Sequence, residues 1–120
     1  MGLETNFQSQ VLEYLNGLPG CKAENVSGNA NQSGRPDING CYHGRMFKIE
    51  LKSPDTGYKP SKKQLLELRK WKRAGCAIGV IYTMKFLKEV FEDDWPEETA
   101  EETHWQNEQS WFIVPMRKVD

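Results

Sequence analysis

The sequence predicts an α/β fold in which a mixed central β-sheet is flanked by helices. Apolar residues recur every three or four positions near the N-terminus and again after residue 61, which is the helical period. Between and after these segments lie short runs that are alternating or β-branched, as strands are. The expected order is helix, strand, strand, helix, strand, helix, strand. At 120 residues the chain is expected to form a single domain, 1–120.

The first helix is predicted over roughly residues 3–16. The residues of its apolar face are Leu3, Phe7, Val11, Leu15 and Leu18. The segment 24–36 is rich in Gly, Asn and Ser and predicts a loop.

Two strands are predicted next, 37–42 and 45–52, with His43-Gly44 as the turn of a hairpin. In the second strand side chains alternate between the two faces of the sheet. This alternation places Glu50 and Lys52 together on the face opposite the apolar residues.

The second half of the chain begins with a capping-box pattern, Ser61 to Gln64, which predicts a helix that ends at Gly75. Its buried stripe is expected to be Leu65, Leu68 and Trp71. Residues 76–83 are apolar and β-branched and predict a strand covered on both faces.

The remaining residues predict a helix over 85–91, an acidic segment over 92–108 that is mostly loop with some helix, and a last strand over 111–114. Trp111 is expected in the core. Trp95 and Trp105 are expected either to anchor the acidic segment or to form a dimer contact.

Charge is distributed unevenly along the chain. The net charge is −1, but residues 89–108 contain nine acidic residues and no Lys or Arg. In the rest of the chain 16 basic residues face eight acidic ones, a net charge of +8. The acidic segment is open to three interpretations: a solvated loop, a repulsive guard against wrong DNA, or a docking surface for the basic face of a second subunit.

Several classes of protein are disfavoured. No apolar run approaches the ~18–20 residues of a membrane span, and no secretory signal is visible, so an intracellular, cytoplasmic location is expected. The three cysteines are far apart and form no C-x-x-C pair, which favours reduced thiols and disfavours a structural zinc site.

The candidate site combines Asp37, Glu50 and Lys52. Two carboxylates on adjacent strands repel one another, and a divalent cation such as Mg²⁺ removes that conflict while leaving positions open for water and phosphate. A lysine on the same strand face can orient the attacking water or stabilise the developing negative charge. The Glu-x-Lys pattern alone has no weight in a chain this rich in both residues. The pattern becomes informative because of the order of features along the chain. Pro36-Asp37 opens a strand, a tight hairpin follows, and Glu-x-Lys ends the next strand.

Gly34-Arg-Pro-Asp37, Ile49-Glu-Leu-Lys52 and Ser61-Lys-Lys-Gln64 together resemble the PD-(D/E)xK nuclease superfamily, and more closely its virus-type replication-repair nuclease (VRR-NUC) family. The resemblance covers about residues 3–83, which are the expected nuclease core, and leaves the acidic segment without a counterpart. It implies a restriction-endonuclease-like core and cleavage of DNA with Mg²⁺ or Mn²⁺, leaving a 5′-phosphate and a 3′-hydroxyl.

The resemblance also implies residue roles. Asp37, Glu50 and the backbone carbonyl of Leu51 match the metal ligands, and Lys52 matches the catalytic lysine. Glu4, in the first helix, matches an acid that reaches the metal through water, and Gln64 matches a glutamine near the site. Small stand-alone members, often phage-encoded, resemble homodimeric enzymes that cut branched DNA such as Holliday junctions.

Each assignment has a purely structural alternative. Glu50 and Lys52 could be an ordinary pair on a solvated strand, Glu4 could favour a helix N-terminus through the helix dipole, and Gln64 could serve only the capping box. For Asp37 the structural alternative is weakest.

A basic run follows the candidate site directly. Its cations are Lys59, Lys62, Lys63, Arg69, Lys70, Lys72 and Arg73. Lys59, Lys62 and Lys63, with Arg35 beside Asp37, are the expected DNA contacts, since Lys and Arg bind phosphates and helix N-termini attract them. A solvated helix face is the alternative for the run.

Three functions remain open at this stage. The first is a Mg²⁺-dependent structure-specific DNA endonuclease. The second is a non-catalytic DNA- or partner-binding module on the same fold. The third is a metal-dependent enzyme acting on RNA or nucleotides.

Overall fold

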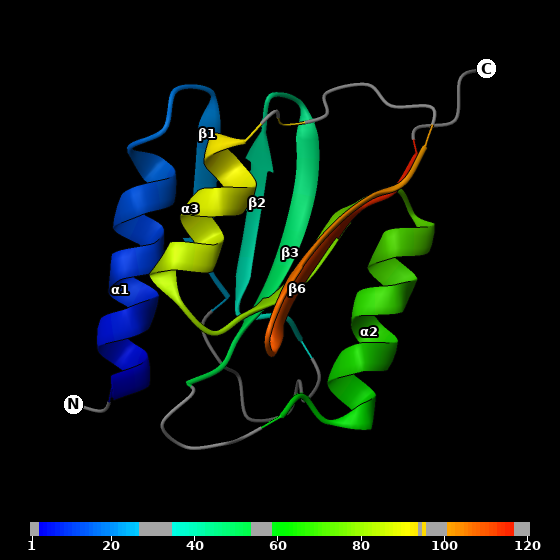
Figure 1. The fold of residues 1–120 in the computed structure, drawn as a ribbon, viewed down its shortest axis with the longest axis horizontal. Coiled ribbons are helices and arrows are strands. Elements are labelled where there is room, and N and C mark those ends of the chain that lie inside the picture. The colour runs from blue at the N-terminus through cyan, green and yellow to red at the C-terminus, as the bar shows by residue number, and fades with distance from the viewer. Residues whose placement is uncertain (1–2, 27–34, 54–58, 94, 96–100, 117–120) are drawn as a thin grey trace.

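The computed structural model describes residues 3–26, 35–53, 59–93, 95 and 101–116, with side chains from Asn6 onward (Figure 1). The helices are α1 (Leu3–Asn16), α2 (Lys62–Arg73) and α3 (Met84–Glu92). The strands are β1 (Cys21–Asn25), β2 (Ile38–Tyr42), β3 (Arg45–Leu51), β4 (Ala77–Ile81), β5 (Thr103–Asn107) and β6 (Ser110–Val114).

The strands form one mixed sheet in the order β1-β2-β3-β4-β6-β5. The β3–β4 pair is parallel and the other pairs are antiparallel. The α2 helix forms the crossover between the two parallel strands, since such a connection must return the chain to the same end of the sheet. The mixed sheet flanked by helices that the sequence predicts is confirmed.

Helices cover both faces of the sheet (Figure 1). On one face α1 and α3 pack together over a large core that includes Val11, Phe47, Phe91 and Phe112. On the other face α2 lies over β3 and β4, where Leu68 packs in a smaller cluster whose other buried members are Ile78, Val80 and Tyr82. The β4 strand is buried along its whole length, as its apolar sequence predicts.

Two local predictions are confirmed by backbone geometry. His43 and Gly44 both have positive φ, 49° and 82°, as a two-residue turn between strands of natural twist requires. At the start of α2, Ser61 Oγ accepts a hydrogen bond from Gln64 N at 3.1 Å, and Gln64 Oε1 accepts one from Ser61 N at 2.9 Å. The capping box therefore exists.

The structure corrects three expectations. A strand, β1, includes the first two residues of the segment 24–36, because its backbone pairs with β2. The acidic segment contains β5 where loop and helix are expected, because residues 103–107 pair with β6. Trp71 is 37% exposed and not part of a buried stripe, because it lies at the margin of α2, over Lys48.

The tryptophans around the acidic segment have distinct places. Trp95 stacks on Phe91, with ring centroids 4.9 Å apart, and Trp105 packs edge-on against Phe112. These contacts anchor the chain on both sides of residues 96–100. Trp111 is half-buried beside the smaller cluster. No helix in the described part of the chain is both long and apolar enough to cross a membrane.

Candidate active site

Two carboxylates meet where β2 begins and β3 ends. Asp37 directly precedes β2, and the antiparallel register pairs Ile38 with Ile49, which places Asp37 opposite Glu50. The amide of Leu51 donates a 2.8 Å hydrogen bond to Asp37 Oδ2 and thereby holds this carboxylate in place. The hairpin predicted from sequence is what brings the two acids together.

Glu50 is buried under the first turn of α2, with 2% of its surface exposed. The side-chain amide of Gln64 donates a 2.8 Å hydrogen bond to Glu50 Oε1, and Lys52 Nζ lies 4.0 Å from the same oxygen. Glu50 Oε2 is buried and accepts no hydrogen bond. Burying a carboxylate oxygen without a donor is costly, so this atom calls for a partner.

Burial raises the pKa of Glu50 from 4.5 to about 9. The negative charge of Asp37 raises the pKa further, while Lys52 opposes the shift. The pair therefore shares a proton near neutral pH in the protein without a metal. A pair of carboxyl groups in this state is one that a divalent cation would ionise.

The donor set fits a hard divalent cation. Mg²⁺ is commonly held by one or two carboxylates and completes its shell with water and substrate phosphate. Asp37 and Glu50 supply the carboxylates, and the unpartnered Oε2 has a lone pair available. Among the described side chains no group of three or more His, Cys, Asp or Glu is arranged for a metal. The site thus offers two protein carboxylates.

The N-terminal half of α1 lies near the same end of the sheet. Gln8 Nε2 donates a 2.6 Å hydrogen bond to Asn25 Oδ1 at the end of β1, and the next amide, Val26 N, binds the carbonyl of Asp37 at 2.9 Å. Glu4 lies one turn before Gln8 in α1, and its side chain is outside the part that the structure describes.

The four expected DNA contacts are all exposed and lie close to the carboxylates in the chain. Arg35 stands two residues before Asp37. Lys59 precedes α2, and Lys62 and Lys63 form its first turn, next to Gln64. The structure thus brings Asp37, Glu50, Lys52 and Gln64 together and places Lys62 and Lys63 in the helical turn that covers Glu50.

Sequence reasoning missed Lys48. Its side chain is 6% exposed, and its ammonium lies 4.0 Å from the centroid of the Trp71 ring. Burial lowers the pKa of Lys48, while nearby Cys76 opposes the shift. Side chains alternate along β3, so Lys48, two residues before Glu50, lies on the same face as Glu50. This spacing is the sequence signal that could have identified Lys48. The Leu51 amide bond to Asp37 had no sequence signal, because backbone donors are the same at every residue.

Comparisons with known proteins bear on the fold. No protein-family model and no curated protein matches the chain. A solved structure described as a VRR_NUC domain superposes with a TM-score of 0.63 at 25% sequence identity. The match covers 77% of this chain and 97% of the other. The similarity is therefore one of fold over about three-quarters of this chain and nearly all of the other.

Proposed function

Because the structural match supports assignment of the chain to the VRR-NUC family, we propose that the chain is a metal-dependent, structure-specific DNA endonuclease. The match supports nuclease activity in general. The observation that supports metal dependence is the buried Glu50 Oε2, which has no hydrogen-bond donor and lies beside Asp37. A divalent cation is the partner that satisfies this oxygen and removes the repulsion between the two acids.

In this proposal Asp37 and Glu50 hold Mg²⁺ or Mn²⁺, together with the backbone carbonyl of Leu51. The ion would supply charge neutralisation at the phosphate and a lowered pKa for bound water. Gln64 fixes Glu50 through Oε1 and leaves Oε2 available, so this oxygen would be the one to hold the ion. Lys52, 4.0 Å from Glu50, is within reach of the attacking water or of a phosphate oxygen, where its charge stabilises the transition state. Glu4 would act on the metal through water.

The proposed substrate is branched DNA such as a Holliday junction, cut to leave a 5′-phosphate and a 3′-hydroxyl. Arg35, Lys59, Lys62 and Lys63 would bind phosphates on either side of the cut. A four-way junction needs two symmetric cuts, which favours a homodimer. A single domain over residues 1–120, phage-encoded and acting inside a bacterial host, fits this activity.

Cleavage assays test the proposal directly. Labelled four-way junction, flap and linear duplex would be incubated with Mg²⁺, Mn²⁺ or EDTA. We expect metal-dependent cleavage of a branched substrate, and a loss of at least 100-fold for Lys52→Ala, because electrostatic stabilisation of the transition state is worth about that much. Lys22→Ala, at an exposed lysine of β1 that pairs with Cys41 toward the turn of the β2–β3 hairpin, serves as the control and should cleave normally. Absence of metal-dependent cleavage on every substrate would overturn the proposal.

The second candidate is a non-catalytic binding module on the same fold. The presence of two acids, the lysine and the glutamine around one site disfavours it, because binding alone gains nothing from a buried carboxylate pair. Tight binding of a junction without cleavage in any metal would favour the module. Labelled RNA in the same assay distinguishes the third candidate, an enzyme that acts on RNA.

A further inference from the structure

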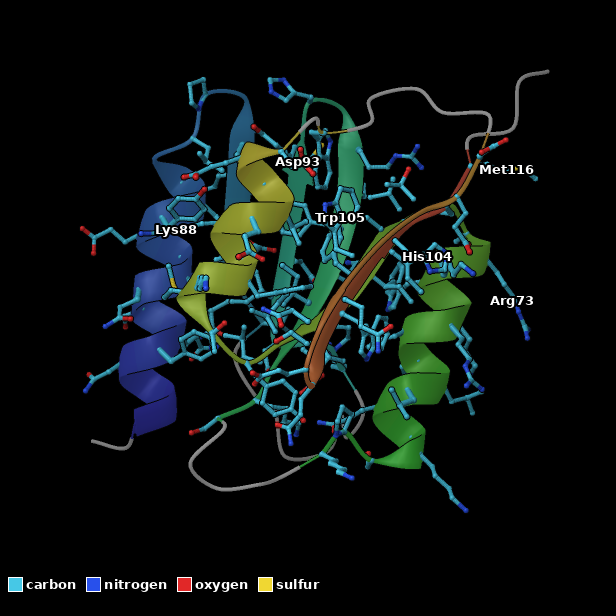
Figure 2. All side chains as sticks on the ribbon, viewed as in Figure 1. Arg73, Lys88, Asp93, His104, Trp105 and Met116 are labelled. Atoms are coloured by element: carbon cyan, nitrogen blue, oxygen red, sulfur yellow. The ribbon has the colours of Figure 1, made fainter. Side chains whose placement is uncertain are left out.

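A groove of about 370 Å³ lies on the α2 face of the sheet, between α2 and the outer strands. One wall is formed by Leu65, Arg69 and Lys72, which are spaced four and three residues apart and so share one side of the helix. The floor and the far wall come from β4, β6 and β5, with Ile78, Trp111, Ile113, His104 and Gln106. Figure 2 shows His104 beside α2. The volume is in the range of ordinary ligand pockets.

The groove and the carboxylate pair are linked by a row of directly paired residues that runs across three neighbouring strands, β3, β4 and β6. Glu50 pairs with Val80, and Val80 pairs with Trp111. All three side chains are on the α2 face, since Glu50 contacts Gln64, and Trp111 packs against the cluster that Val80 and Leu68 form. Neighbouring strands are roughly 4.8 Å apart, so Trp111 lies about 10 Å from Glu50 across the sheet. Val80, between them, is buried with Leu68 beneath α2, so a DNA strand that contacts both sites would pass around the first turn of this helix.

The chemistry of the groove suits an unpaired base. It offers the half-buried indole of Trp111, apolar side chains around it, and the cations Arg69 and Lys72 at the α2 wall. Lys72 also binds Glu102, which binds His104 at 2.6 Å, so the outer rim is polar and hydrogen-bonded. Aromatic platforms beside cations are how proteins hold single strands, because every base has a stacking face and every nucleotide a phosphate. Bases inside a duplex are already stacked and paired, so the groove suits an unpaired base and not a base within a continuous duplex.

We propose that the Trp111 groove binds an unpaired nucleotide of the DNA strand next to the phosphate that is cut. This inference rests on the proposed nuclease function for the position of the cut, but the binding itself needs no metal. The groove would favour DNA with unpaired bases at a branch over continuous duplex. Specificity for branched DNA would then come from the body of the domain.

Binding measured in EDTA tests the groove apart from catalysis. The probes are a labelled single-stranded octanucleotide and a blunt duplex, with Trp111→Leu compared with the unaltered chain. We expect Trp111→Leu to bind the single strand at least about fivefold more weakly and the duplex within about twofold, since the loss of one stacked base weakens single-strand binding by at least that factor. Trp111→Phe retains a ring and should keep most of the affinity. Trp71→Leu, which removes the exposed indole over Lys48, is the matched control and should bind normally.

The result that would overturn the inference is unchanged single-strand binding by a folded Trp111→Leu variant, or an equal loss for duplex. Should Trp111→Leu fail to fold, Arg69→Gln on the α2 wall gives the same comparison. A change in self-association with no change in oligonucleotide binding would overturn the inference in favour of a second copy of the chain in the groove.

A fluorescent base reports contact in the unaltered protein. The base 2-aminopurine would be placed at successive unpaired positions of a forked DNA in EDTA, and the cut would be mapped separately with Mg²⁺. We expect quenching to be greatest at the unpaired base next to the cut, and quenching at no position would overturn the inference. If no DNA is cut but the single strand still binds through Trp111, the proposed function fails and the base-binding groove stands. If DNA is cut and Trp111→Leu binds normally, only the groove fails.

Discussion

Glu50 is held in an environment that opposes its charge. It is buried, faces Asp37, and receives one hydrogen bond from Gln64 and a distant charge from Lys52. Sequence alternation predicts the face on which Glu50 lies, and the hairpin predicts its closeness to Asp37. The sequence pattern does not predict that Glu50 is buried. Its burial depends on how α2 packs over β3, and the local pattern of β3 contains no information about that packing.

The burial of Glu50 makes stability depend on pH. The pKa of Glu50 is about 9 in the folded chain and near 4.5 when unfolded, so unfolding releases a proton and stability falls as pH rises from 4.5 to 9. We expect Glu50→Gln in EDTA to be more stable than the unaltered chain by about 1–3 kcal/mol at pH 8, with a smaller gap at pH 5.

Urea unfolding at the two pH values measures this gap. The same variant should lose metal-dependent cleavage, because an amide is a poor ligand for Mg²⁺. Glu67→Gln, which removes a partly exposed carboxylate of α2 that pairs with Lys70, is the control for the loss of a carboxylate. A gap of equal size at both pH values would contradict the expectation.

At the scale of elements, α2 organises the site. Its capping box orients Gln64, whose side-chain oxygen binds Ser61 N while its amide binds Glu50. One residue therefore closes the helix start and positions the carboxylate, so both sequence-based interpretations of Gln64 are compatible with the geometry. The capping box was predictable because its partners lie within four residues. Strands β1 and β5 could not be predicted in the same way. Both are short, polar edge strands that form only because their backbones pair with β2 and β6.

Strand β4 needs a glycine at position 79 for close packing against β6. A Cβ there would lie 2.4 Å from a ring carbon of Phe112 and 2.8 Å from the carbonyl oxygen of Trp111. We expect Gly79→Ala to lower the free energy of unfolding by about 1–3 kcal/mol, because strands must separate or the ring must leave its rotamer.

Denaturant titration tests this, and Phe112→Leu provides the second arm of a double-mutant cycle. The double variant should lose less stability than the sum of the single changes, since the smaller side chain relieves part of the clash. A neutral Gly79→Ala would show that β4 and β6 are not as close as the structure has them.

Over the whole molecule, opposite charges lie in separate segments that meet at one place. The cations of α2 extend from its first turn, beside the site, to its last turn, and the acidic segment reaches Lys72 through Glu102, which also binds His104. The separation of charge was predictable from a count along the chain. The ion pair between Lys72 and Glu102 was not predictable, because the two residues are thirty positions apart in the chain and meet only when β5 joins the sheet.

The positions of individual lysines should influence DNA binding more than the net charge of the chain does. We expect Lys62→Glu with Lys63→Glu to weaken DNA binding and to reduce the slope of log affinity against log salt by about one for each lysine. The paired change Lys22→Glu with Lys88→Glu alters the net charge equally but lies on β1 and α3, away from the first turn of α2, so it is the matched control. A salt titration that gives both variants the same slope would contradict a local contact.

The acidic residues around β5 have a further consequence, for colloidal behaviour. In the described part of the sheet β5 is an edge strand with one row of backbone groups unpaired by β6. Its five residues include no carboxylate, lysine or arginine, and such a strand is a template for intermolecular pairing and fibril growth. Exposed Glu101, Glu102 and Glu108 stand immediately outside it. Like charges at these positions on two copies of the chain oppose the pairing of their edge strands.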